Sequence, residues 1–316
     1  MEHVVSAYST LRNPPEFDFP CELLDHRDSS HRNFFHHLSG LVGFVVDRGK
    51  RNMTSSLHAV VDHVQRVQHH FSFSLEPSEV PSIAQWCWAS NSILLFPDGS
   101  LRDPSGNMLV DPKTGLASEN AEIPYPTGAK ARAARSAARL HELGIPTLDD
   151  LPPVVSEPEV SVRDADEVAW RILSLFIVAV RAESLASGKP IAVDRLREKS
   201  PMAFQSLTPN EQAFLGLDSP DEQAITNAVW RYEAMYALQW ALGIHDELRF
   251  ADKICDVPLV AQIMVDRPDN EFVTDARLRD ASEILDALDL NQRMLWSARD
   301  AARHRRPAPA GIDGSV

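Results

Sequence analysis

The sequence predicts an α+β fold, in which a small N-terminal α+β domain with a mainly antiparallel sheet precedes a mostly α-helical domain. Short strand-like and helix-like runs alternate over about the first 110 residues. Beyond residue 129 the apolar residues recur almost only at helical spacing. The segment between the two parts, DPKTGLASENAEIPYPTG (111–128), is rich in turn residues and has no period. We therefore expect domains at 1–112 and 129–316, joined by a linker at 113–128.

Strand signals in the N-terminal part come from β-branched and aromatic residues in short runs bounded by turn residues. They predict strands at HVVSAYSTL (3–11), GLVGFVVDRG (40–49), FSFSLE (71–76) and SILLF (92–96), and a hairpin at LRDPSGNMLV (101–110). Helical spacing of apolar residues predicts an amphipathic helix at 53–70, with Thr54 or Asn52 as its N-cap, and a shorter helix at 80–91. We expect these helices to pack against the sheet.

Capping residues indicate where several helices of the second part begin and end. Asp164 or Asp166 is the expected N-cap of a long helix that ends at Gly188. Thr208 is the N-cap of another helix, and Glu211 three residues later completes a capping box. The predicted helices cover 129–144, 162–188, 207–216, 222–242 and 274–303, the last with a possible break.

The composition argues against several function classes. A net charge of −14 disfavours binding to nucleic acids, because phosphate contacts require clustered Lys and Arg. The most apolar run, ILSLFIVAV (172–180), has half the length that a bilayer crossing requires, so it indicates a buried helix. The N-terminus lacks the apolar segment of a signal peptide, and the three cysteines are scattered as in cytosolic proteins. We expect a soluble cytoplasmic protein with no membrane or nucleic-acid partner.

The stretch WRYEAMYALQWALG (230–243) raises the question of a site, because it is apolar on nearly every helical face yet carries Arg231 and Glu233. Residues two apart do not face each other, so each charge needs a partner from another helix. The segment LRDASEILDALDLNQRMLWSARD (278–300) offers a polar stripe with carboxylates and arginines. We expect Arg231 to meet Glu283 or Asp286, and Glu233 to meet Arg279 or Arg293, beside an apolar stripe through Leu278, Ala281, Leu285, Leu288 and Leu295.

Two interpretations of these charges remain open. In the first, they form a charged pocket whose carboxylates act as general acid or base, with Arg231 binding an anion. In the second, which we favour, they are an ion-pair network that holds helices together, so that removing either Arg231 or Glu233 costs on the order of 3–5 kcal/mol. The candidate site residues are the same in both: Arg231, Glu233, Glu283, Asp286, Asp289 and Arg293.

No motif indicates a metal, a cofactor or an activated nucleophile. His58 and His63 are five residues apart, which places them about 140° apart around a helix and does not suit joint ligation. The sequence contains no HExxH, no paired CxxC, no nucleophile elbow and no phosphate-binding glycine loop. Cys255 is better explained as a small buried side chain than as a nucleophile. We therefore expect no cofactor and no metal.

Several blocks carry a resemblance to a known family. LPPVVSEPEVSVRDADEVAWR (151–171), LTPNEQAFL (207–215), WRYEAMYALQWALG (230–243), CDVP (255–258) and LRDASEILDALDLNQRMLWSARDA (278–301) together resemble the bacterial family designated domain of unknown function 4272. The resemblance runs from about residue 129 to the end, and the preceding part resembles the N-terminal extension of longer members. It implies fold relatives and no established chemistry.

This chain departs from the family pattern in its last helix. The pattern there has Tyr-Arg and His-Trp, where this chain has Gln292-Arg293 and Leu295-Trp296. The pattern also continues past the position of Val316 into a further segment. If the family uses those Tyr and His groups in a reaction, this copy lacks part of the machinery. Both departures favour a binding or structural role.

Two function hypotheses follow. The first is a protein–protein interaction module of the immunity or adaptor type, whose acidic surface favours a basic partner. The alternative is an enzyme of unassigned class that uses a carboxylate and arginine pocket between the helices 222–242 and 274–303. The observation that separates them is whether the candidate side chains line an open concavity or are sealed and mutually paired.

Overall fold

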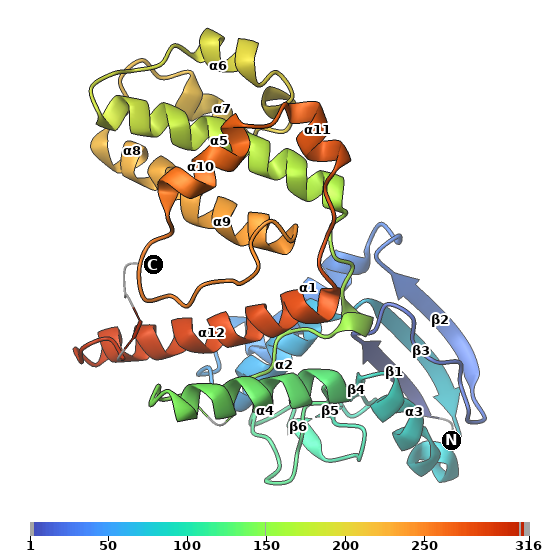
Figure 1. The fold of residues 1–316 in the computed structure, drawn as a ribbon. Coiled ribbons are helices and arrows are strands. Elements are labelled where there is room, and N and C mark those ends of the chain that lie inside the picture. Colours follow the sequence, from blue (N-terminus) through green and yellow to red (C-terminus); the bar gives the residue numbers. More distant parts are fainter. Residues whose placement is uncertain (1–2, 149, 310, 313–316) are drawn as a thin grey trace. The chain divides into compact units, whose positions relative to one another are not determined.

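The computed structural model describes residues 3–148, 150–309 and 311–312, which fall into two compact units (Figure 1). Unit 1 spans Met1–Arg135 and Asp150–Ser161, and unit 2 spans Ser136–Asp149 and Val162–Val316. The boundary between the units falls inside the helix α4 (Thr127–Glu142). The predicted division of the chain at 1–112 and 129–316 stays a prediction. The chain passes from unit 1 to unit 2 at residue 136, returns to unit 1 at residue 150 and enters unit 2 again at residue 162.

Unit 1 contains a six-stranded sheet with the order β2-β3-β1-β4-β5-β6. Every neighbouring pair is antiparallel, which confirms the predicted α+β class with its antiparallel sheet. The strands are β1 (His3–Ser9), β2 (Glu22–Asp28), β3 (His69–Leu75), β4 (Ser92–Leu95), β5 (Leu101–Arg102) and β6 (Met108–Val110).

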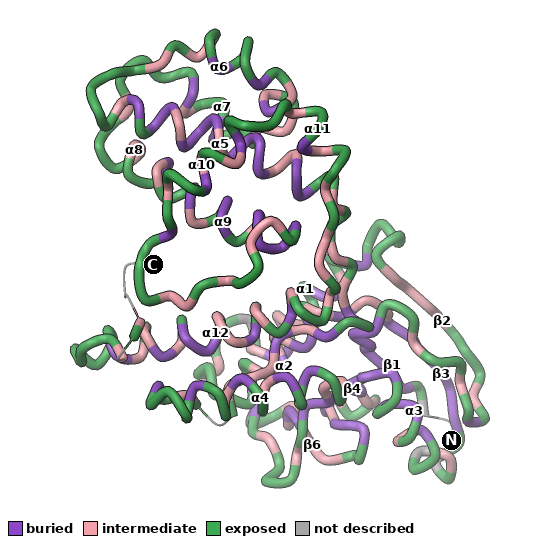
Figure 2. Tube along the Cα trace, in the orientation of Figure 1, coloured by how far each residue is buried: buried purple, intermediate pink, exposed green. Residues whose placement is uncertain are grey.

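Successive side chains of a strand point to opposite faces of the sheet. Both faces of this sheet are covered, each by its own hydrophobic core. On β1, Val5 and Ala7 belong to the core that includes Trp86 of α3 (Ile83–Ala89). Tyr8 belongs to the other core, which is built with α1 (Phe34–Val45) and α2 (Ser55–Arg66). Figure 2 shows the resulting stretch of buried chain through β1 and β3.

The predicted strand at 40–49 is wrong, because most of that segment belongs to α1. Phe34, Leu38, Leu41 and Val45 are buried at spacings of four, three and four residues, which is a helical stripe. The prediction followed the β-branched residues of the second half and missed the stripe, which begins upstream at Phe34. The strand β2 was not predicted at all, because ELLDHRD has only two apolar residues and both are exposed.

Unit 2 is built around α5 (Ala165–Ala186), which is buried on several sides, as the apolar run predicted. Helices packed around it include α8 and α9. Among the described residues, no helix is long and apolar enough to cross a membrane. The other helices of the unit are α6 (Val193–Lys199), α7 (Pro209–Leu215), α8 (Glu222–Val229), α9 (Arg231–Ala241), α10 (Val257–Val265), α11 (Asp269–Thr274) and α12 (Ala281–Arg303), and short 3-10 helices of the chain are η1 (Asp47–Gly49), η2 (Pro77–Ser82), η3 (Glu157–Glu159) and η4 (Ala203–Gln205).

The predicted N-caps at Thr208 and Asp164 are confirmed. Thr208 accepts a hydrogen bond from the Glu211 amide, and the Glu211 carboxylate accepts one from the Thr208 amide. Asp164 begins α5 with the same reciprocal arrangement. Two predicted helices differ: 222–242 is divided at Trp230 into α8 and α9, and 274–303 begins only at Ala281.

Candidate functional site

The charges of the WRYEA stretch are not sealed between helices. The Arg231 side chain is exposed and takes part in no hydrogen bond or ion pair within the described chain. Glu233 is half-buried, and its Oε1 accepts a hydrogen bond of 2.6 Å from the backbone amide of Cys255. The expected pairs of Arg231 with Glu283 or Asp286, and of Glu233 with Arg279 or Arg293, are therefore wrong. Helix α9 is only partly buried, so its N-terminal arginine reaches water.

Arg279 instead joins the segment before α12 to the end of α9. Its guanidinium donates to the carbonyl oxygens of Trp240 and His245 at 2.8 and 2.7 Å, and also to that of Asp246. It also forms an ion pair of 3.0 Å with Glu283, one turn along the chain. Glu283 and Asp286 are both exposed. Arg279 is thus a connector of backbone segments rather than a partner for Glu233.

The buried charges of the candidate set are Asp289 and Arg293. They lie four residues apart on α12, and the Arg293 Nε donates to the Asp289 Oδ2 at 2.9 Å. Their side chains are only 1% and 3% exposed. Of the six candidate residues, these two are brought together, and they are sealed.

Helix α12 reverses part of the expected pattern. Leu288 and Leu295, expected in the buried apolar stripe, are 48% and 47% exposed, whereas Asp289 and Arg293 of the polar stripe are buried. The two buried charges have opposite signs and lie one turn apart on the same helix, which offsets part of the cost of burying them. The leucines are left as exposed apolar side chains.

Those leucines line two adjoining concavities, which we call the α12 groove. The first has a volume of about 380 Å³ and lies between α9, the chain after it and α12; its lining includes Glu233, Trp240 and Cys255. The second has a volume of about 730 Å³ and lies farther along α12. Ala251, Leu288 and Asn291 line both concavities.

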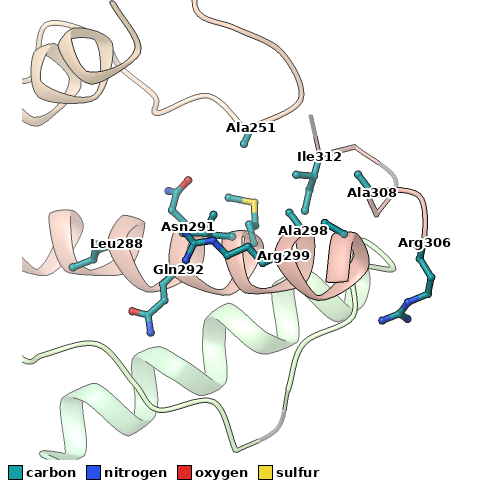
Figure 3. A pocket seen from close by; sticks show the side chains of 12 residues that line it. Ala251, Leu288, Asn291, Gln292, Ala298, Arg299, Arg306, Ala308 and Ile312 are labelled. Carbon is teal, nitrogen blue, oxygen red and sulfur yellow. The ribbon is translucent and has the colours of Figure 1, made fainter. Parts of the chain in front are cut away.

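Figure 3 shows how the second concavity is walled. Ala251 approaches α12 from the chain between α9 and α10, and Ile312 approaches from the chain beyond α12. Arg299 and Arg306 also line this concavity, and Arg306 forms an ion pair with Asp300. The α12 groove is therefore apolar along its helix and has cationic side chains at one end.

The chemistry available in the groove is limited. Burial, followed by the adjacent Glu233 carboxylate, raises the pKa of the Cys255 thiol to about 12. A thiol with such a pKa is not an activated nucleophile, because the thiolate is the reactive form. Glu233 is the one candidate residue that reaches the concavity, and its Oε1 is held by a backbone amide. Arg231, Glu283, Asp286, Asp289 and Arg293 do not line it.

The two histidines of α2 lie in different surroundings. His63 is completely buried, with its Nε2 at 3.1 Å from the carbonyl oxygen of Tyr8. Burial is the main cause that lowers the pKa of His63 to about 3. His58 is exposed and pairs with Asp62 one turn along the same helix. His63 is therefore a neutral core residue.

The sequence predicted a pocket between the helices 222–242 and 274–303, where the first concavity of the α12 groove lies, but it missed the second concavity and most of the residues that line the groove. Its signal was present in the departure Leu295-Trp296, where the resemblance leads one to expect a histidine, but it was interpreted only as a lost functional group. The chain between α9 and α10, which supplies Lys253 and Cys255 to the first concavity, has no periodic pattern. Its position could therefore be known only from the folded chain.

Comparison with known proteins agrees with the resemblance of the helical blocks. No curated protein and no solved structure matches the chain. One family model matches residues 132–316, which is more than half of the chain and includes α9, α12 and the whole α12 groove. The chain therefore belongs to the family described as Domain of unknown function (DUF4272).

Proposed function

We propose that the family region is a protein-binding module, of the immunity or adaptor type, whose α12 groove takes an apolar segment of a partner protein. The observation that carries the proposal is the outward position of Leu288 and Leu295 beside the concavities. Large apolar side chains that line a concavity mark binding sites more often than scattered surface residues do. An amphipathic helix laid along α12 is the simplest occupant of such a groove.

The net charge of the chain and the charges at the groove favour different features of the partner. The net charge of −14 favours a basic partner during diffusion. At the groove itself, Arg299 and Arg306 favour a carboxylate next to the apolar segment. The proposed partner is thus a basic protein whose binding segment is apolar with an acidic flank. Its association rate falls with salt, while the bound contact depends on apolar burial.

The test is affinity capture from a bacterial lysate with the parent chain, with Leu288→Glu/Leu295→Glu, and with Val265→Glu as the matched control. Val265 is an exposed apolar residue of α10 that lines neither concavity. We expect a partner that the parent and Val265→Glu capture equally, and that the groove variant captures at least about tenfold less. All three proteins should melt at similar temperatures, because the substituted residues are exposed. Capture that the groove variant retains would contradict the proposal, as would background recovery at both low and moderate salt.

An enzymatic role is the second candidate, and Glu233 at the 380 Å³ concavity is the observation that favours it. A carboxylate there can serve as a general base or bind a cationic group. It ranks lower because the neighbouring Cys255 thiol has a raised pKa and the other candidate residues lie elsewhere. The test is a thermal-shift screen of small metabolites against the parent and Glu233→Gln. A compound that raises the melting temperature of the parent alone would favour this role, and the absence of any such compound would count against it.

A further inference from the structure

A second site lies in unit 1, outside the family region, where three potential ligands meet on one face of the sheet. His26 and Asp28 are two residues apart on β2, so both side chains point to the same face. His69 of β3 lies directly opposite Asp28 in the strand register. One ligand atom from each of the three residues lies within 4.8 Å of the other two. We propose that His26, Asp28 and His69 bind a divalent transition-metal ion of the Zn²⁺ class.

The hydrogen bonds of His69 prepare it as a ligand. Its Nε2 lies 3.0 Å from the backbone carbonyl oxygen of Arg12, an acceptor that requires the ring proton on Nε2. The neutral ring then has its lone pair on Nδ1, and that atom lies 3.0 Å from the His26 Nε2. A histidine that binds a metal through one ring nitrogen usually donates a hydrogen bond from the N–H of the other. The acceptor is a carbonyl or carboxylate oxygen, which fixes the tautomer.

Asp28 is prepared in a similar manner. Its Oδ1 accepts hydrogen bonds from the Ser30 amide at 2.9 Å and the Ser30 hydroxyl at 2.6 Å, and it lies 3.4 Å from the His31 Nδ1. None of the hydrogen bonds and ion pairs within the described residues uses Oδ2. The carboxylate is thus oriented through one oxygen, and the other can coordinate an ion.

The positions of the rings require little adjustment. His26 stacks on Phe71 with ring centroids 4.6 Å apart and an interplanar angle of 5°, which holds the ring in place. Tetrahedral ligation at the usual Zn–N length separates two imidazole nitrogens by about 3.3 Å, close to the 3.0 Å between His26 and His69. When the ion binds, the His26 proton lies on Nδ1 and its Nε2 faces the metal.

The ligand set indicates the class of ion. Two imidazoles and one carboxylate suit Zn²⁺ and other first-row divalent ions, whereas Ca²⁺ and Mg²⁺ prefer oxygen ligands alone. All three residues are only half-buried, so ions can enter from solvent. Three protein ligands leave a coordination position for water or for a group from a bound molecule. The spacing His-x-Asp on a strand was the sequence signal, but β2 was not recognised as a strand.

The experiment measures binding of Zn²⁺ alone to the full chain by competition with a chromophoric chelator. We expect one equivalent to bind to the parent, and the affinity to fall by about 100-fold or more in His26→Ala and in His69→Ala. His58→Ala is the matched control, because His58 is an exposed histidine paired with a single aspartate. It should bind Zn²⁺ as the parent does.

Two further measurements exclude a folding artefact. Zn²⁺ should raise the melting temperature of the parent and of His58→Ala, but not that of the two ligand variants, each of which should melt cooperatively without metal. Co²⁺ should give the visible absorption of a low-symmetry site in the parent, and Asp28→Asn should change it. The proposal fails if the parent binds no Zn²⁺ at micromolar concentration, or if the ligand variants bind it as tightly as the parent. Its failure would leave the groove proposal untouched, because no ligand lies in the family region.

Discussion

An arginine and a carboxylate of the candidate set lie close in sequence on α9 and again on α12, and the two pairs have opposite surroundings. On α12, Asp289 and Arg293 are four residues apart, face each other and are buried. On α9, Arg231 and Glu233 are two residues apart and point in different directions. The arginine side chain is exposed to water, and the carboxylate accepts a hydrogen bond from the backbone amide of Cys255. A charge can be buried where its own helix supplies the opposite charge one turn away.

The same comparison explains why the expected interhelical network is absent. A network between α9 and α12 would have had to bury four long side chains, each with a desolvation penalty of several kcal/mol. In the structure the Arg293 guanidinium donates to Asp289, one turn away on its own helix, and not to Glu233 of α9. Four predictions test this comparison, from the largest expected effect to the smallest.

The largest effect is expected for Arg293→Met, which removes the guanidinium that donates to the buried Asp289 carboxylate. Removing one partner of a buried ion pair costs on the order of 3–5 kcal/mol. We expect a clear drop in the melting temperature or loss of soluble protein. A double-mutant cycle with Asp289→Asn is the control, since the double variant should be destabilised by less than the sum of the two single variants. An unchanged melting temperature for Arg293→Met would break the comparison.

The pH dependence of His63 tests a buried group that has no opposite charge beside it. Its folded-state pKa of about 3 lies below the ordinary value for histidine of about 6.5, mainly because of burial. Between these values the unfolded chain binds a proton and the folded chain does not, so stability is lost as the pH falls. The loss approaches about 1.4 kcal/mol for each pH unit.

Urea unfolding of the parent and of His63→Gln between pH 7 and pH 4.5 measures this loss. The glutamine variant should show a shallower decline in the free energy of unfolding, because it carries no titrating ring at this position. Parallel declines in the free energy of unfolding of the two proteins would contradict this expectation. They would mean that His63 is protonated as readily in the folded chain as in the unfolded chain. Other groups that titrate in this range, such as His70 with a pKa lowered to about 4 mainly by burial, contribute equally to both proteins.

A smaller effect is expected for Glu233→Ala. The substitution removes the acceptor of the Cys255 amide, and an unsatisfied amide near the surface costs on the order of 1–2 kcal/mol. Denaturant unfolding measures the change. Glu233→Gln is the control, since its side-chain oxygen can still accept the hydrogen bond and should retain most of the stability. Equal losses in both variants would mean that the negative charge, and not the hydrogen bond, matters.

The smallest effect is expected for Arg231→Met. Its side chain is exposed and has no partner among the described residues, so the free energy of unfolding should change by about 0.5 kcal/mol or less. The sequence alone led us to expect 3–5 kcal/mol for this residue. A drop of several degrees in the melting temperature of Arg231→Met would contradict this expectation. It would support the interhelical network that the sequence alone predicted.

The prediction of individual elements succeeded where the signal was local. The cap at Thr54, the box at Thr208 and Glu211, and the strand at FSFSLE all proved correct. These features depend on a few neighbouring residues that compete for the same backbone groups. The strand predicted at 40–49 failed because a buried helical stripe overrode the β propensity of Val42, Val45 and Val46. No local rule decides between two such patterns when both are present.

The candidate site was predictable to a smaller extent. The sequence identified α9 and α12 as the elements of interest, and the first concavity of the α12 groove does lie between them. It placed the wrong residues there, since Glu233 alone of the six candidates lines a concavity. The direction of a helix face depends on what the rest of the chain packs against, and an apolar stripe and a neutralised charged stripe are both able to be buried.

The amino-acid sequence by itself determined the α+β class, the capped ends of several helices and membership of the family, because these follow from periodicity, caps and short sequence blocks along the chain. Only the tertiary structure decided that α12 buries Asp289 and Arg293 while exposing Leu288 and Leu295, and that His26, Asp28 and His69 meet across two strands. These outcomes depend on which distant segments become neighbours. That choice minimises the free energy of the whole chain, and no short stretch of sequence contains it.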